Sequence, residues 1–182
     1  HQIQSSAHYK ARTTLNITAD GNLVLQDPRF TGDPAMYDGP SYVFVDAFNM
    51  EPDGTITFGL EPAAGGDQRV GTYPQIFANT ADITDANFVA NLAPQNGLFA
   101  DSYFWDNVID AVTLTGEFAS CSIGAPFDVS PLLGLTCIYD AGENVDIGLE
   151  RVAFNELAGL TDNQLAVATA LENVFSTSLT GP

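Results

Sequence analysis

Short alternations of apolar and polar residues recur along the chain and predict β-strands. Leu15 and Ile17 alternate with polar neighbours, a tight turn follows at 20–22, and residues 23–25 form the return strand. Because side chains alternate between the two faces of a strand, each such segment gains one apolar face. The same signature predicts strands at 41–48, 55–60, 71–80, 103–105 and 108–114, with a turn at 106–107, and two strands about a glycine turn at 137–149.

The hydrophobic period changes to that of a helix near the end of the chain. Thr161 is a good N-cap residue, Gln164 completes a capping box, and Asp162 lies in the first turn. The apolar residues that fall near one face of this predicted helix are Leu165, Ala168, Leu171 and Phe175. A strand-rich body therefore ends in one helix.

Two segments of the chain lack a clear strand pattern. Residues 81–100 suit a short helix or irregular coil, and residues 27–40 form a loop with three prolines and two glycines. Long loops on a regular scaffold often carry binding functions. Asp27, Asp33 and Asp38 share this loop and are weak candidates for calcium ligands, although neither an EF-hand nor another calcium repeat is present.

Two sequence echoes indicate an internal repeat. TADGNLVLQDP is echoed by EPDGTITFGLEP, and SYFWDNVIDAVTL is echoed by TCIYDAGENVDIGL. Repeated short strands with corner turns indicate a parallel β-solenoid, with roughly 20–30 residues per coil and about six to eight coils. A β-sandwich remains the alternative, because the same alternation serves both folds.

The end of the chain resembles a known protein family. LTDNQLAVATALENVF is similar to the "TPNQ–AVA–ALD" segment of bacterial autotransporters, and YDAGENVDIGLER resembles the last strands of their secreted passenger. Asp162 stands where that family usually has proline. The resemblance covers about forty residues and implies an all-β, right-handed parallel β-solenoid with a short C-terminal helix or hairpin cap.

The resemblance also implies a role and a location. It indicates one domain over 1–182, in which residues 136–182 form a capping segment like the autochaperone region of the passenger. The expected protein is a non-enzymatic surface protein of a Gram-negative bacterium, with a structural or adhesive role. Its candidate partners are a second copy in fibres or layers, a surface glycan or a host protein, and it needs no cofactor.

Charge and composition narrow the partners further. The chain has 23 acidic and 5 basic residues, a formal net charge of −18. Phosphates would be repelled, which argues against nucleic acid and against anionic membrane surfaces. No run of 18 apolar residues occurs, so we expect no transmembrane helix, and no signal peptide is visible.

The two cysteines predict one local disulfide. Fifteen residues separate Cys121 from Cys137, and a structural metal site would need four ligands. Closing a loop of that size stabilises a fold by roughly 3 kcal/mol and implies an oxidising compartment. The alternative is a pair of buried free thiols.

Catalytic constellations are weak in this sequence. The two histidines, His1 and His8, lie near the start, and neither a G-x-S-x-G elbow nor a phosphate-binding glycine motif occurs. A copper site at His1 would need a more distant second histidine. Asp101, Asp106 and Asp110 are carboxylates of the kind that glycosidases use, yet turns and solvated faces explain them.

Two alternative functions stay open beside the surface-protein hypothesis. One is a carbohydrate-active hydrolase or lyase on a β-solenoid, and the other is a β-sandwich pilin or adhesin subunit. The strand aromatics are expected in the core, with a sugar-binding platform as the alternative; they are Tyr42, Phe44, Phe48, Phe58, Tyr73, Phe77, Tyr103, Phe104 and Trp105.

Overall fold

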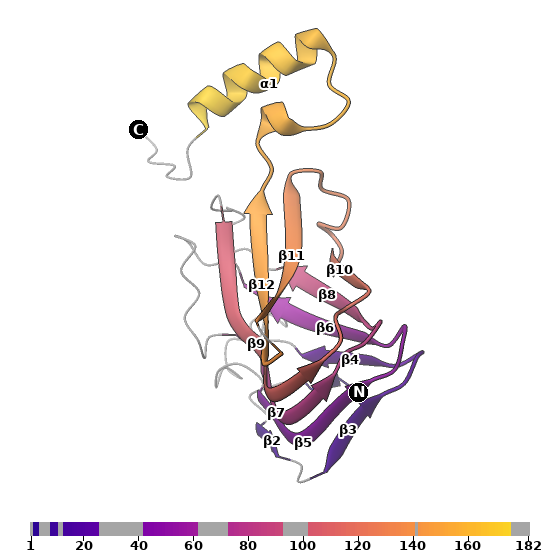
Figure 1. Cartoon of the computed structure of the whole chain (residues 1–182). Coiled ribbons are helices and arrows are strands. Elements are labelled where there is room, and N and C mark those ends of the chain that lie inside the picture. The colour runs from indigo at the N-terminus through magenta and orange to yellow at the C-terminus, as the bar shows by residue number, and fades with distance from the viewer. Residues whose placement is uncertain are drawn as a thin grey trace, which may run out of the picture.

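The fold is seen in a computed structural model of the whole chain (Figure 1). The structure describes residues 2–3, 8–10, 13–25, 42–61, 73–92, 102–140 and 142–175. The loop with Asp27, Asp33 and Asp38 lies outside the described residues, as do His1 and Asp101.

The described part is mostly strand, with one short α-helix near its C-terminal end. One sheet, sheet A, contains β1 (Gln2–Ile3), β4 (Asn22–Leu25), β6 (Thr55–Leu60), β8 (Asn87–Leu92) and β10 (Ser120–Ile123). The other, sheet B, contains β2 (His8–Lys10), β3 (Thr14–Ile17), β5 (Tyr42–Met50), β7 (Gln75–Asp82), β9 (Ser102–Thr115), β11 (Leu133–Asp140) and β12 (Asn144–Arg151). A 3-10 turn, η4 (Phe154–Glu156), and α1 (Asp162–Val174) follow.

The chain alternates between the two sheets and returns to each in parallel register. In sheet A the aligned positions are Asn22, Thr55, Asn87 and Ser120. Asn87 and Ser120, whose side chains are hydrogen-bonded to each other, lie 33 positions apart. The same separation of 33 positions relates Asn16 and Asn49 in sheet B. The circuit predicted from the sequence was therefore too short, and the predicted number of coils was too high.

The pairing pattern argues against the antiparallel β-sandwich. Of the ten strand ladders in the described residues, two are antiparallel, and both belong to the hairpin β11–β12 and its contact with β9. A sandwich of the immunoglobulin type consists of antiparallel ladders throughout.

The passages from sheet B to sheet A are corners that stack on one another. Gly21 N–H donates to Thr18 C=O within the first corner (2.7 Å), and Gly54 N–H to Glu51 C=O within the second (2.9 Å). Asn87 N–H then donates to Gly54 C=O between circuits (2.8 Å). The turn at 20–22 was expected to lead into a return strand of a hairpin, but β3 and β4 lie in different sheets. The first sequence echo is thus a true structural repeat of this corner and the strand after it.

A single hydrophobic core lies between the two sheets. Aligned positions contribute apolar side chains circuit after circuit, such as Leu23, Ile56 and Phe88 in sheet A, all at most 1% exposed. Phe58 and Phe88 stack with ring centroids 5.4 Å apart. Each fully buried side chain of this size contributes roughly 1.5–3 kcal/mol to the free energy of unfolding, so the aligned apolar positions add a similar contribution in each circuit.

Two strand predictions were wrong. Residues 87–92 form β8, where Phe88, Ala90 and Leu92 alternate into the core; Val89 on the outer face hides this period from a reader of the sequence. The expected turn at 106–107 is a bend inside the single strand β9, in which Asn107 has a φ of 52°. The second sequence echo therefore matches one bent strand to a hairpin.

The aromatic side chains divide between the core and the outer face of sheet B. Buried as predicted are Phe48, Phe58, Tyr73, Tyr103 and Trp105. Phe44 and Phe104 are 37% and 44% exposed, and Tyr42 and Phe77 are half-buried, so the prediction of core packing was wrong for these four.

Candidate functional site

The antiparallel hairpin β11–β12 occupies the edge of sheet B next to β9. Val145 and Ile147 of β12 and Trp105 of β9 are fully buried, and Ile147 aligns with Trp105 in the ladder. The sequence pattern predicts that Val145, Ile147 and Leu149 alternate with the polar positions Asp146, Gly148 and Glu150, but Asp146 is buried as well. The hairpin therefore pairs the backbone groups that β9 would otherwise expose at the sheet edge.

A disulfide ties the hairpin to the other sheet. Cys121 of β10 and Cys137 of β11 are bonded, with their Cα atoms 6.0 Å apart. Cys137 aligns with Ile147 inside the hairpin, and Cys121 aligns with Phe88 inside sheet A. The edge strands of both sheets are thus joined at this end of the core.

A buried polar cluster lies at the bend of β9. Asp146 is 9% exposed, and one of its carboxylate oxygens accepts a hydrogen bond from the Asn107 backbone N–H (2.7 Å). The Gln75 side-chain amide donates to Asn107 C=O (3.0 Å), and the Tyr73 hydroxyl donates to Asp106 C=O. The ladder between β9 and β12 shifts register at this point, and the cluster satisfies the backbone groups that the irregularity releases.

Burial dominates the electrostatics of this cluster. It raises the pKa of Asp146, the hydrogen bond from Asn107 opposes that rise, and the charge of Asp106 adds to it. Burial likewise raises the pKa of the Tyr73 hydroxyl, which acts as a hydrogen-bond donor in the cluster. The arrangement resembles a satisfied structural network, since its polar atoms are directed at backbone groups.

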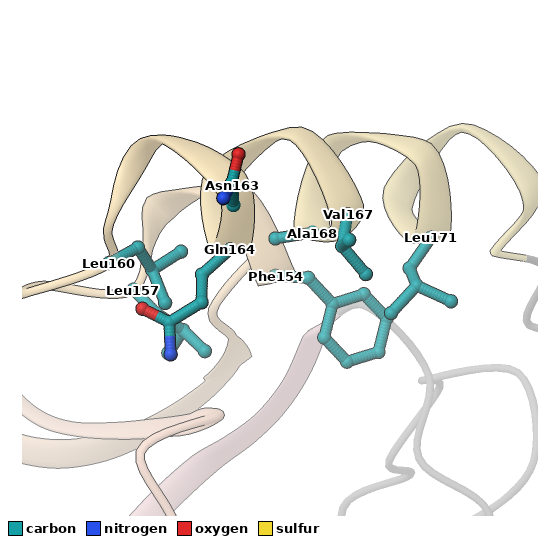
Figure 2. A pocket seen from close by; sticks show the side chains of 8 residues that line it. All are labelled: Phe154, Leu157, Leu160, Asn163, Gln164, Val167, Ala168 and Leu171. Atoms are coloured by element: carbon teal, nitrogen blue, oxygen red, sulfur yellow. The ribbon is translucent and has the colours of Figure 1, made fainter.

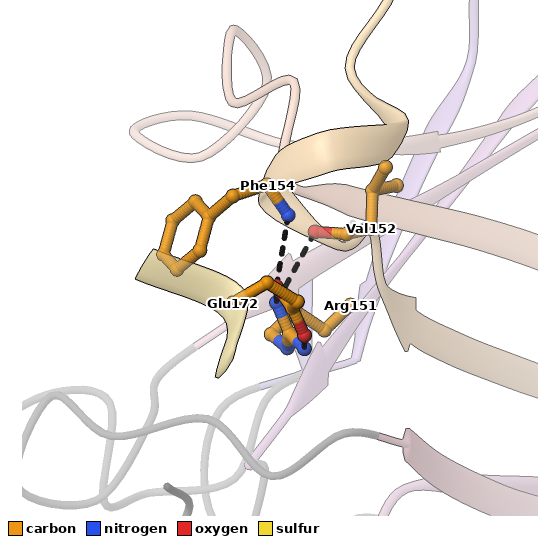
Figure 3. Close-up of polar contacts among 4 residues, drawn as sticks. All are labelled: Arg151, Val152, Phe154 and Glu172. Atoms are coloured by element: carbon orange, nitrogen blue, oxygen red, sulfur yellow. Dashed lines mark hydrogen bonds and ion pairs between the residues drawn. The ribbon is translucent and has the colours of Figure 1, made fainter. Parts of the chain in front are cut away.

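A second polar contact fastens the C-terminal helix to the end of β12. Arg151 reaches Glu172 with both guanidinium nitrogens, at 3.0 and 2.5 Å, and Glu172 also accepts from the Phe154 N–H at 3.0 Å (Figure 3). The guanidinium carbon lies 3.9 Å from the Phe175 ring centroid. The Arg151 hydrogen bonds are the main reason that the pKa of Glu172 is lowered. We call these four residues the clamp.

Helix α1 begins where the sequence predicts but does not cover the core, and it ends at Val174, with Phe175 as an extended C-cap residue. Thr161 and Gln164 form the expected capping box, with Thr161 N–H donating to Gln164 Oε1 at 2.9 Å. One α1 residue, Ala168, is buried. The helix packs on η4 and lies beyond the hairpin, away from the stacked circuits (Figure 1). Of the two elements that the resemblance implies as a cap, the helix and the hairpin, the hairpin is the one that packs on the core.

An apolar groove lies between α1 and the segment before it. It has a volume of about 400 Å³ and is lined mainly by Phe154, Leu157, Leu160, Val167, Ala168 and Leu171 (Figure 2). Val167 is 60% and Leu171 49% exposed, and Val174 nearby on the helix is 76% exposed. The end of the molecule that carries α1 thus presents apolar surface on an otherwise acidic chain.

The candidate residues from the sequence are not gathered in one place. Asp106 and Asp110 lie in β9, where Asp106 joins the polar cluster. Backbone placement alone is described for His8, in β2. Within the described residues no group of three or more histidine, cysteine or acidic side chains is arranged to hold a metal ion.

Two parts of the site had no sequence signal. The clamp joins Arg151 to Glu172 across 21 positions, too far apart for a helical spacing rule to relate them. Asp146 looked like an ordinary polar position in an alternating strand, and the register shift in the ladder is what buries it.

Comparisons with known protein families, curated proteins and solved structures find no match to this chain. Among the described residues, no helix has both the length and the apolar character that crossing a membrane requires. The functional argument therefore depends on the geometry and on the sequence itself.

Proposed function

We propose that this chain is the C-terminal part of an autotransporter passenger: a right-handed parallel β-solenoid stem, closed by a folding cap, on the surface of a Gram-negative bacterium. Its role is structural or adhesive. The observation that carries the proposal is the nearly constant step between parallel strands, 33 positions from Asn87 to Ser120, in a series that ends at one antiparallel hairpin.

The constant step supports a solenoid because each circuit then contacts its two neighbours and no other. Stability is the sum of similar interfaces, and a terminal element must protect the last one. Hairpin β11–β12 meets that requirement, since it pairs with β9 and is bonded through Cys137 to β10. A disulfide of this kind suits export to an oxidising compartment.

The exposed apolar helix fits the same proposal. In the family that the tail resembles, this segment lies where the passenger passes toward its translocating barrel. A connecting helix with that task has no reason to bury its face against the stem. The exposed Val167, Leu171 and Val174 and the clamp at Arg151 support an element that is attached to the cap but not part of the core.

Two truncations test the cap. A chain that ends at Val152 keeps the hairpin and loses η4 and α1, and we expect its melting temperature to change by a few degrees at most. A chain that ends at Ser130 loses the hairpin, and we expect the whole body to lose cooperative unfolding, because the β9 edge and core become exposed. Circular dichroism melts measure both, and equal melting of the two truncations would refute the cap.

Surface delivery tests the biological part of the proposal. The chain is placed between a signal peptide and a translocating barrel in a Gram-negative host, and its exposure is followed by protease added to intact cells. We expect a protease-resistant stem outside the cell for the natural chain and a degraded or retained one when residues 131–152 are deleted. A natural chain that stays inside, or is as protease-sensitive as the deletion, would contradict the proposal.

A further inference from the structure

A row of side chains crosses the outer face of sheet B, on the side away from the core. In register across the strands it contains Phe44, Phe77, Asp110, Asn144 and Asp140, from β5, β7, β9, β12 and β11 in turn. Their neighbours along each central strand, such as Ile76 and Ile109, are fully buried, so the row faces outward. Figure 1 shows these strands side by side. We call this set the Phe77 row.

The first half of the row is aromatic. Phe44 and Phe77 stack with ring centroids 4.8 Å apart and planes 11° from parallel, and Tyr42 lies 6.0 Å from Phe77. Because β7 lies between β5 and β9, the other face of the Phe77 ring is turned toward β9. The next position there is Asp110, which has no ring. The aromatic stack therefore stops beside a smaller, polar residue.

The second half of the row consists of hydrogen-bond acceptors. Asp110 and Asp140 are carboxylates on either side of Asn144, with which each aligns in its ladder. The Asn144 Oδ1 atom is buried and has no hydrogen-bond partner among the described residues, so the half-buried Asp110 carboxylate is the acceptor that lies next to Phe77. Acceptors of this kind need donors such as hydroxyl groups.

We propose that the Phe77 row binds a neutral saccharide. A pyranose ring would lie over Asp110 against the Phe77 ring, continuing the aromatic stack, and would donate its hydroxyl groups to Asp110. Aromatic faces suit the apolar C–H faces of such rings.

The charge of the surface selects a neutral ligand. Two carboxylates, Asp110 and Asp140, lie on the β9 side of Phe77 in the row, and the chain as a whole carries a formal charge of −18. Sulfated or carboxylated glycans would be repelled. A second copy of this chain would bring the same carboxylates to the contact and is disfavoured for the same reason. Lys10 of β2 aligns with Phe44 at the opposite end of the row, three strands from Asp110.

This inference deepens the adhesive role in the proposed function but rests on the outer face of sheet B and not on the cap. Failure of saccharide binding would leave the stem and its hairpin intact, and failure of the truncation experiment would leave the Phe77 row in place.

Titration with defined saccharides tests the inference. Neutral hexasaccharides of glucose, mannose and galactose, and a heparin-derived hexasaccharide, are each added to the full chain, and binding is followed by calorimetry and by NMR shifts. We expect at least one neutral hexasaccharide to bind with a Kd of about 1 mM or tighter and to shift the amides of Phe77, Asp110 and Asn144. The heparin fragment should bind at least tenfold more weakly.

Variants then locate the contact. Phe77→Leu keeps an apolar side chain but removes the ring face, and Asp110→Ala removes an acceptor, so each should weaken binding at least tenfold with little change in the melting temperature. Val112→Ala is the matched control, because Val112 is 74% exposed two positions away on the same face of β9. Absence of binding by every neutral probe, tighter binding of heparin, or equal binding by Phe77→Leu would overturn the inference.

Discussion

At the scale of single residues, Asp146 shows how one buried carboxylate stabilises an irregular strand. One carboxylate oxygen of Asp146 accepts a hydrogen bond from the Asn107 N–H. The burial of the charged carboxylate still lowers the free energy of unfolding, because the hydrogen bond does not fully replace its hydration. Because its pKa is raised in the folded state, the cost is absent below the ordinary value of about 3.9 and grows as the pH rises through the folded-state pKa.

This balance predicts opposite results for two substitutions at Asp146. Asp146→Asn keeps an acceptor for Asn107 and removes the charge, so we expect the free energy of unfolding at pH 7 to stay equal or increase. Asp146→Ala leaves the N–H without a partner and should lower that free energy by about 1–3 kcal/mol. Urea unfolding between pH 4 and 7 measures both, and a loss in Asp146→Asn as large as in Asp146→Ala would contradict the explanation.

Two glycines with similar backbone angles predict different costs. Gly116 has a φ of 76°, and a Cβ atom there would lie 2.7 Å from the Thr84 Cα of the stacked corner. Gly159 has a φ of 80°, with nothing within 4 Å of such an atom. Gly159→Ala should therefore cost about 1–2 kcal/mol for the left-handed backbone alone, and Gly116→Ala about 1–3 kcal/mol more for the clash.

Denaturant unfolding of the two alanine variants checks this difference. Equal destabilisation would mean that the corners of neighbouring circuits do not touch as closely as the Gly116–Thr84 contact requires.

At the scale of elements, the hairpin and the helix have separate tasks. The hairpin buries Val145, Ile147 and Leu149 in the core, whereas α1 buries Ala168 and is held by the clamp at Arg151 and Glu172. Because the pKa of Glu172 is lowered in the fold, the stabilisation by its carboxylate is complete above the ordinary value of about 4.3 and is lost as the pH falls through the folded-state pKa.

Acidification should therefore release α1 before it unfolds the sheets. We expect hydrogen-exchange protection of the Phe154 amide, which donates to Glu172, to fall below about pH 4, while protection of β7 and β9 amides persists. Glu172→Gln should lower that protection several-fold at pH 7 and flatten its pH dependence. Glu156→Gln is the control, since Glu156 is an exposed acidic residue of η4. Loss of sheet protection together with Phe154 would contradict a separate helix.

The secondary-structure elements that could be predicted from the sequence are those determined by residues close together along the chain. The capping box located α1 to within one residue, and alternation located β12, because both patterns are contained in a few neighbouring residues. The bend at Asn107 and the strand β8 were missed, since the partners that determine them lie one whole circuit away along the chain. The Arg151–Glu172 contact was missed because its two residues are likewise distant in sequence.

At the scale of the whole molecule, the disulfide is the one covalent link between the sheets in the described residues. Replacing Cys121 and Cys137 together by serine should lower the free energy of unfolding by up to about 3 kcal/mol, because the unfolded chain regains the freedom that the closed loop removes. The urea midpoint of the natural chain with and without reductant, and of the double variant, measures this. A midpoint that reductant does not change would contradict it.

The sequence predicted a strand-rich body with a C-terminal helix but not the length of its circuit. Strand length and corner residues are visible locally, whereas the circuit includes long segments without a strand pattern, such as 27–40, whose contribution cannot be counted from alternation. Only the registered pairs, Asn22 with Thr55 and Thr55 with Asn87, reveal the step.

Because of that step, the same few kinds of contact recur in every circuit, but each added circuit requires a long segment of chain. Adding one strand to each sheet lengthens the molecule by roughly 4.8 Å and uses one full circuit of chain, as the alignment of Leu23 with Ile56 shows. An insertion or deletion inside a strand shifts the pairing register of the residues that follow it in that strand. The gain or loss of one whole circuit leaves the pairing register of all remaining strands unchanged. Growth of such a molecule by duplication is therefore easiest in units of one circuit, a step of 33 positions between Asn87 and Ser120, each bringing its own corner and its own share of the core.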